Sequence, residues 1–115
     1  MKKGTYFGTE INGSWWKRYR ASGFFARGNG EFWLDDEGLH FLRLMTKAPL
    51  TIPWNEMTEA TWGKWHAGRW ANGRPILKVG FVRDGQELTA GFYLSKEWAP
   101  IEELAADLNK RIAGS

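Results

Sequence analysis

Two segments of the chain interleave aromatic and basic side chains, a combination that can bind anionic or planar ligands. The first covers residues 15–20 (WWKRYR) and the second covers residues 64–74 (KWHAGRWANGR). Indole rings stack on flat groups, while Lys and Arg side chains bind phosphates and carboxylates. Trp and Arg are also common at the contact points between proteins. The candidate ligand-binding residues are Trp15, Lys17, Arg18, Arg20, Trp65, His66, Arg69 and Trp70.

Each segment also has a structural interpretation. The Trp15–Trp16 pair can pack against the core while the neighbouring cations extend over it into solvent. In the second segment, Trp65 and Trp70 can fix a long loop against the N-terminal part of the chain. A further hypothesis joins the two segments in one basic aromatic groove, formed by Trp15, Trp16, Trp65, Trp70, Arg18, Arg20, Arg69 and Arg74.

Support for catalysis is weak. The sequence has no cysteine, which excludes disulfides, thiolate catalysis and cysteine-bound zinc. His40 falls in a predicted strand, where a hydrogen-bonded structural role is expected. His66 is a better candidate for a general base, but no carboxylate or nucleophile lies near it in the sequence. The acidic triplet at residues 35–37 lacks the spacing of an EF-hand loop, so we expect no metal and no cofactor.

The charge distribution is uneven although the net charge is small. The chain carries 16 Lys and Arg against 13 Asp and Glu, a net charge of +3, which is too little to require a nucleic-acid partner. Nine of the 16 cations fall in residues 11–30 and 60–83, and these windows contain no acidic residue. We therefore expect a protein partner or a second copy of the chain, with nucleic acid or anionic lipid as alternatives.

Alternation of apolar and polar residues, with turn residues between the runs, predicts a mainly β protein. The predicted strands cover residues 31–35, 39–45, 50–54, 60–65, 77–82 and 88–94, with a seventh over 22–27. Asp84-Gly85 predicts a tight hairpin turn, which requires two positive φ angles. Near the C-terminus the spacing becomes helical and predicts an amphipathic helix over residues 99–113. Its apolar face consists of Ile101, Leu104, Ala105, Leu108 and Ile112.

The length of 115 residues is typical of a single domain. Residues 1–21 show no clean period and are predicted to form an N-terminal extension or irregular segment. No apolar run follows Lys2 and Lys3, and no run elsewhere is long enough to cross a membrane. We therefore expect a cytoplasmic protein without a transmembrane segment.

The order of these elements resembles the pleckstrin-homology-like (PH-like) superfamily, including its GRAM-type and bacterial members. Residues 30–41 (GEFWLDDEGLHF) are similar to the strand, acidic turn and strand that open GRAM-type domains, and residues 52–57 (IPWNEM) to the segment that follows. The resemblance covers residues 22–113. It implies a barrel of six to seven antiparallel strands in two near-orthogonal sheets, capped by one C-terminal amphipathic helix.

Residues 13–30 and 64–70 also resemble a small group of uncharacterised bacterial proteins. Phosphoinositide-binding PH domains typically carry Lys and Arg around their first hairpin loop. If residues 30–42 form that hairpin, its tip is the acidic triplet at residues 35–37, which would repel a phosphate. Together these observations predict a non-enzymatic binding module that recognises an anionic ligand or a protein partner through its basic aromatic residues. Nucleic-acid or anionic-lipid binding, and a small enzyme using His66, are the alternatives.

Overall fold

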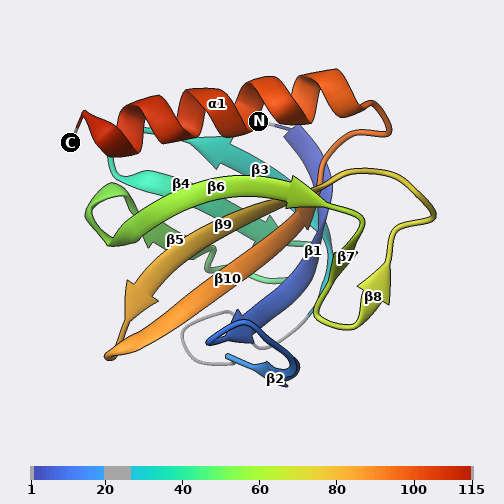
Figure 1. Ribbon diagram of the computed structural model, residues 1–115, viewed down its shortest axis with the longest axis horizontal. Helices are drawn as coiled ribbons and strands as arrows, with labels where there is room; N and C mark the ends of the chain where they lie inside the picture. Colours follow the sequence, from blue (N-terminus) through green and yellow to red (C-terminus); the bar gives the residue numbers. More distant parts are fainter. Residues whose placement is uncertain (1, 20–26, 115) are drawn as a thin grey trace.

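The computed structural model describes residues 2–19 and 27–114, which form a curved β-sheet, a small hairpin and a C-terminal helix (Figure 1). The elements are β1 (Lys2–Ile11), β2 (Ser14–Arg18), β3 (Gly28–Leu34), β4 (Gly38–Arg43), β5 (Leu50–Pro53), the 3-10 helix η1 (Trp54–Glu56), β6 (Met57–Gly63), β7 (Trp65–His66), β8 (Arg69–Trp70), β9 (Ile76–Arg83), β10 (Gln86–Tyr93) and α1 (Trp98–Ala113). Residues 22–26 of the strand predicted over 22–27 lie outside the described residues.

Hydrogen bonds join the strands of the main sheet in the order β5-β4-β3-β1-β10-β9-β6, and β2 pairs with the end of β1. The pairings are antiparallel. The mainly β architecture with one C-terminal helix is thus confirmed. The end strands β5 and β6 do not pair with each other, so the sheet is not closed into a barrel. Because hydrogen bonds run without a break from β5 to β6, these strands form one sheet. The expectation of two near-orthogonal sheets is therefore not confirmed either.

The N-terminal segment differs most from the expectation. Residues 1–21, predicted as an extension or irregular segment, contain β1 and β2, and β1 lies inside the sheet between β3 and β10. The pairing of β1 with β10 shifts between Tyr6 and Gly8, and such a bulge changes which residues face inward. As a result Tyr6 and Thr9 are both buried and their hydroxyl groups share a hydrogen bond of 2.5 Å. This break in the alternation hides the strand from sequence analysis.

The first hairpin is consequently β1–β2, so the condition that residues 30–42 form it is not met. Its turn is Asn12-Gly13, where φ is 50° and 74°. The acidic triplet instead lies between β3 and β4, the second pair along the chain. The charge argument made for an acidic first tip therefore does not apply to this protein.

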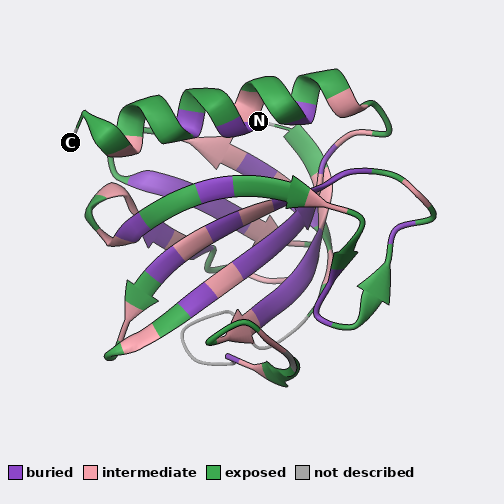
Figure 2. Cartoon of the chain, viewed as in Figure 1, coloured by how far each residue is buried: buried purple, intermediate pink, exposed green. Residues whose placement is uncertain are grey.

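The core lies inside the curved sheet and is formed by alternate residues of its strands (Figure 2). In β9 and β10 the alternation matches the sequence prediction, and the Asp84-Gly85 turn between them has φ angles of 54° and 72°. The strand predicted over 39–45 ends earlier, because β4 stops at Arg43 and the side chain of Met45 is fully exposed. Packing of this inner face supplies the apolar burial on which the fold depends.

Helix α1 covers one side of the core and lies along β6 (Figure 1). Ile101, Ala105 and Leu108 are fully buried, and Leu104 and Ile112 pack against the same core while remaining partly exposed. The predicted apolar face is therefore confirmed. Because an isolated helix of this length is marginally stable in water, its docking on the sheet stabilises it.

The free edge of β6 is covered by a side chain of this helix. Asn109 accepts a hydrogen bond from the backbone N–H of Ala60 at 2.8 Å and donates one to the carbonyl oxygen of Ala60 at 2.9 Å. The amide thus occupies both backbone positions that a neighbouring strand would use. An unpaired edge strand is a template for aggregation, and Asn109 blocks this one at its centre.

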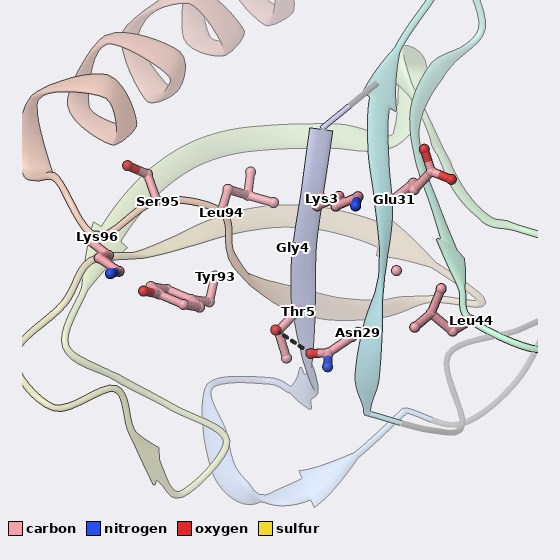
Figure 3. Close-up of a pocket in the computed structure, with 11 residues that line it drawn as sticks. Lys3, Gly4, Thr5, Asn29, Glu31, Leu44, Tyr93, Leu94, Ser95 and Lys96 are labelled. Carbon is pink, nitrogen blue, oxygen red and sulfur yellow. Dashed lines mark hydrogen bonds between the residues drawn. The ribbon is translucent and has the colours of Figure 1, made fainter.

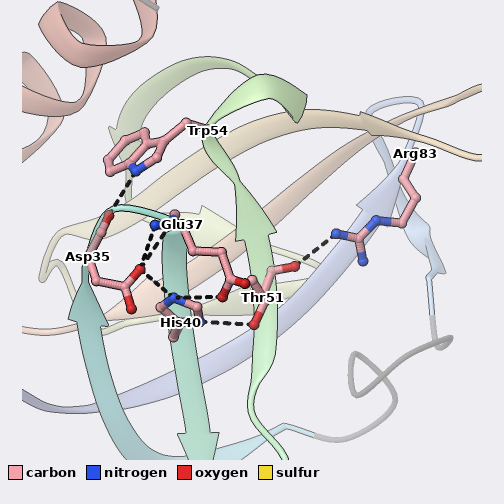
Figure 4. A network of polar contacts seen from close by, with 7 residues as sticks. Asp35, Glu37, His40, Thr51, Trp54 and Arg83 are labelled. Carbon is pink, nitrogen blue, oxygen red and sulfur yellow. Dashed lines mark hydrogen bonds and ion pairs between the residues drawn. The ribbon is translucent and has the colours of Figure 1, made fainter.

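A network of polar contacts holds the other end of the sheet together (Figure 4). His40 bonds to Asp35 Oδ1 at 2.8 Å through Nε2 and to Thr51 Oγ1 at 2.9 Å through Nδ1, which confirms the structural role expected for it. Arg83 of β9 donates to the carbonyl oxygen of Thr51 at 2.8 Å and to Glu56 at 2.6 Å. These side-chain contacts link β9 to the β5–η1 segment, where strand pairing is missing.

Replacement of Asn109 by Ala should lower the free energy of unfolding by about 1–2 kcal/mol, because two backbone groups of Ala60 lose their partner. The measurement is urea-induced unfolding followed by tryptophan fluorescence. Asp107→Ala, on the exposed side of the same helix, is the matched control and should change stability by less. Equal stability of the two variants would contradict this role of Asn109.

Candidate functional site

The β7–β8 hairpin packs on the outer face of the main sheet through the imidazole ring of His66. The ring lies on Gly91 of β10, where an added Cβ atom would be 2.2 Å from it. Gly91 is paired with Gly8 of β1, so two adjacent strands lack side chains at this point. His66 is 1% exposed, and its Nε2 atom donates to the carbonyl oxygen of Gly8 at 2.8 Å. The glycine pair therefore forms the recess that holds the ring.

The tip of this hairpin is fixed by three charged side chains. Ala67 and Gly68 form a two-residue turn with positive φ angles of 53° and 77°. The N–H of Ala67 donates to Glu10 Oε2 at 2.7 Å. Its carbonyl oxygen accepts hydrogen bonds from Arg18 and from Arg27, the latter at 2.5 Å. The two basic aromatic segments of the sequence are thus in contact, through Arg18 and a backbone carbonyl group.

Burial keeps the imidazole of His66 neutral at physiological pH. Desolvation lowers its pKa from the ordinary value of 6.5 to about 4, although the Glu10 carboxylate and the Gly8 carbonyl group act in the opposite direction. Because a carbonyl oxygen can only accept, Nε2 carries the proton. Nδ1 is then an acceptor, lies 3.8 Å from Glu10 Oε2, and has no hydrogen-bond partner among the described residues.

A cavity of about 450 Å³ opens beside this ring, between the hairpin and the sheet. We call it the hairpin cavity, and it is lined by Glu10, Trp65, His66, Ala67, Gly68 and Lys78. The side chain of Glu10 is 14% exposed. Lys78 projects from the same outer face, since it pairs with Gly91 across β9 and β10. The cavity therefore combines a carboxylate, an ammonium group and an indole ring.

The tryptophans of the hairpin face solvent and do not attach it to the protein. The rings of Trp65 and Trp70 stack with centroids 6.4 Å apart, and the two residues are 57% and 51% exposed. The guanidinium group of Arg69 lies 4.8 Å from the ring centre of Phe7. His66 and the backbone of Ala67 hold the hairpin in place, which leaves both indole rings available for a ligand.

The first basic aromatic segment is only partly described. Trp16 and Lys17 lie in β2 and are exposed, whereas Arg18 is half-buried against the hairpin. Trp15 also lies in β2. Arg20 lies outside the described residues. The two segments lie next to each other at the contact of Arg18 with Ala67, and neither of two cavities lined by the second segment has a lining residue from 15–18.

A second hollow extends over the outer face of β3, β1 and β10. Two cavities of about 570 Å³ and 250 Å³ share Thr5, Asn29 and Tyr93, so we treat them as one outer groove. Figure 3 shows the lining of the larger cavity. Four cations and one carboxylate line it: Lys3, Lys96, Arg69, Arg74 and Glu31. The groove also contains exposed aromatic surface from Trp70. This arrangement suits a ligand that carries negative charge at several positions.

Several lining residues of the outer groove are absent from the sequence-based candidates. Lys3 lies in the segment expected to be irregular, and Lys96 follows β10 far along the chain. Tyr93 and Asn29 meet there only because β10 and β3 both pair with β1. Arg74, which the sequence analysis did include, donates to the Tyr93 hydroxyl group at 3.1 Å. Strand order, which the sequence does not reveal, is what brings these residues together.

The acidic turn between β3 and β4 has the geometry of a metal site in one respect. Asp35, Glu37 and His40 offer ligand atoms within 4.8 Å of one another. Both ring nitrogens of His40 are already bonded within the protein, and Asp35 Oδ1 also accepts from the N–H groups of Glu37 and Gly38. These contacts account for the cluster as part of the hairpin structure, without a metal ion.

His66 should make the stability of the protein depend on pH. Its pKa is lower in the folded state than in the unfolded chain, so the unfolded chain binds a proton first as the pH falls. Stability is therefore complete above pH 6.5 and decreases as the pH falls toward about 4, by roughly 3 kcal/mol. Urea unfolding at neutral pH and near pH 4.5 measures this loss. His66→Phe should lose less over the same interval, and an equal loss in this variant would exclude His66 as the cause.

Comparison with known proteins identifies a family. No curated protein matches the sequence. Within the part of the chain that the structure describes, no helix has the length and apolar character needed to span a membrane. The model of one protein family, described as Bacterial PH domain-like, matches residues 1–107. This match confirms the resemblance found in the sequence and, in general terms, indicates a binding module. The chain belongs to the bacterial PH domain-like family.

Proposed function

We propose that this protein is a non-enzymatic binding module that takes an acidic segment of a protein partner into the outer groove. The observation that carries the proposal is the joining of two hollows at Thr5, Asn29 and Tyr93, with four cations and a single carboxylate along them. Membership of a PH-like family supports a binding role in general. The ligand itself is inferred from the chemistry of the groove.

The charges of the groove are well placed for an extended ligand. Lys3 and Lys96 are exposed and make no hydrogen bond or ion pair with the described residues, so their ammonium groups are available. Arg74 and Arg69 lie at the other end, beside the exposed ring of Trp70. Carboxylates along a peptide can contact these cations while an apolar side chain packs on the indole ring.

A protein ligand is favoured over nucleic acid by the charge balance. Glu31 of β3 lies opposite Lys3 of β1 in the strand register and lines the same groove. A carboxylate at this point repels a continuous phosphate backbone, whereas a peptide can place a neutral or basic residue beside it. The net charge of only +3 agrees with this preference. Nucleic acid and anionic lipid remain as alternative ligands that the experiment below separates.

Catalysis by His66 is less well supported by the geometry. Its Nε2 atom is committed to the carbonyl oxygen of Gly8, and Nδ1 is 3.8 Å from Glu10, beyond hydrogen-bond distance. Nδ1 is also shielded from solvent. A general base needs access to the proton that it removes, so we assign His66 to the structure of the hairpin.

The test uses three probes with the full chain: a fluorescent peptide that carries two glutamates on each side of a central glycine and phenylalanine, a single-stranded oligothymidylate and vesicles containing phosphatidylserine. We expect the peptide to bind, and the Lys3→Gln/Lys96→Gln variant to bind it about tenfold more weakly because two rim charges are lost. Fluorescence anisotropy at two salt concentrations measures the affinities.

The matched control is Lys47→Gln/Lys110→Gln, which removes the same charge from exposed positions outside the groove. This variant should bind the peptide within about twofold of the wild type. Equal weakening in both double variants would show that net charge, rather than the groove, determines binding. Binding of the oligonucleotide or the vesicles without the peptide would replace the proposed ligand by that alternative.

A further inference from the structure

We propose that the hairpin cavity is a second binding site, which takes a small zwitterionic ligand of the dipeptide class, with its amino group on Glu10 and its carboxylate on Lys78. It shares no lining residue with the outer groove. Its volume of about 450 Å³ falls in the range of small-molecule sites. The proposal is therefore independent of the acidic ligand proposed above.

At the Glu10 end of the cavity, one buried acceptor lacks a hydrogen-bond donor. Glu10 Oε2 and His66 Nδ1 are both acceptors and lie 3.8 Å apart, and Nδ1 is a buried atom without a partner among the described residues. Buried acceptors that lack a donor are costly and rare in folded proteins. A ligand ammonium group has three donors and can bond to the Glu10 carboxylate. Because Nδ1 is shielded from solvent, a bond to that atom as well requires the Glu10 side chain to move aside.

The identity of the missing donor follows from charge. Glu10 forms no ion pair with a Lys or Arg among the described residues, since Arg18 and Arg27 donate to the carbonyl oxygen of Ala67. The carboxylate is mostly buried and accepts from a single backbone N–H. A positively charged donor compensates such a carboxylate better than a hydroxyl group or a neutral amide does.

Lys78 provides the complementary charge on the opposite side. Its Nζ atom leans toward the end of β6, where a Cβ atom on Gly63 would lie 3.1 Å from it. Lys78 makes no hydrogen bond or ion pair with the described residues. Glu10 and Lys78 are borne on β1 and β9, which flank β10, and lie opposite Thr89 and Gly91 of that strand. Two strand spacings and an offset of two residues place their backbones about 12 Å apart. An extended dipeptide spans about 7 Å, which suits charged groups reaching inward from both strands.

The indole ring of Trp65 completes the site at the rim. It lines the cavity and is 57% exposed, so it offers a flat apolar surface to a ligand side chain. The peptide groups of the turn at Ala67 and Gly68 form the rest of the wall. Because Glu10, Arg18 and Arg27 fix the backbone of Ala67, the cavity is built before the ligand arrives, which lowers the entropic cost of binding.

The experiment compares glycyl-phenylalanine with N-acetyl-glycyl-phenylalanine and with glycyl-phenylalanine amide, each titrated into the full chain. Calorimetry gives affinities, and amide chemical shifts of Ala67 and Gly68 report where the peptide binds. We expect the free dipeptide to bind and each blocked analogue to bind at least about tenfold more weakly. No binding of the free dipeptide at roughly 10 mM, or equal affinities for all three peptides, would overturn the proposal.

Two variants test which residue binds each charged end of the dipeptide. Lys78→Gln, at a position that makes no hydrogen bond or ion pair with the described residues, should abolish the preference for the free dipeptide over its amide while keeping the preference over the acetylated form. Glu10→Gln retains an acceptor for Ala67 and should show the reverse pattern. Arg74→Gln in the outer groove is the control and should leave dipeptide affinity unchanged. Retention of both preferences in both variants would exclude these residues as the charged ends of the site.

Discussion

The packing of the His66 ring on the Gly8–Gly91 pair is the contact on which the outer surface of this protein depends. Any side chain at Gly91 would occupy the space of the imidazole. With the ring in place, β7 of the hairpin lies against β1 and β9 of the sheet. Trp65 then lines the hairpin cavity and Trp70 lines the outer groove. The hairpin cavity and the smaller hollow of the outer groove therefore depend on two glycines and one buried histidine, whereas no residue of the hairpin lines the larger hollow.

The cations of the chain divide into two groups with different roles. Arginines make many of the structural contacts: Arg18 and Arg27 hold the Ala67 carbonyl group, Arg83 bonds to the β5–η1 segment, and Arg111 lies 3.9 Å from the centre of the Trp54 ring. Three lysines line the cavities and make no hydrogen bond or ion pair with the described residues: Lys3 and Lys96 in the outer groove and Lys78 in the hairpin cavity. Arg69 and Arg74 line the outer groove as well. A guanidinium fork satisfies fixed acceptors in several directions, whereas a flexible ammonium group adapts to a ligand.

The open sheet places both sites on the face opposite the helix. Helix α1 and the inner face of the strands enclose the core, and Asn109 and Arg83 satisfy backbone groups at the two unpaired edges. The outer face carries its own small apolar cluster, in which Phe7, Ala71, Ile76 and Tyr93 attach the chain between β8 and β9. In this bacterial PH domain-like protein we therefore propose binding sites on the outer face of a rigid sheet, where short connecting segments border it.

The sequence by itself determined the elements whose signals are local. Alternation predicted the mainly β fold, Asp84-Gly85 predicted its turn, and the spacing of Ile101 and Leu108 predicted the buried face of the helix. It also marked residues 64–74 as a candidate binding segment. Only the tertiary structure showed β1, whose bulge interrupts the alternation. The proximity of Glu10 to His66, and of Lys3 to Lys96, likewise depended on which strands pair, because that choice is made by packing between residues far apart in the chain and leaves no local pattern.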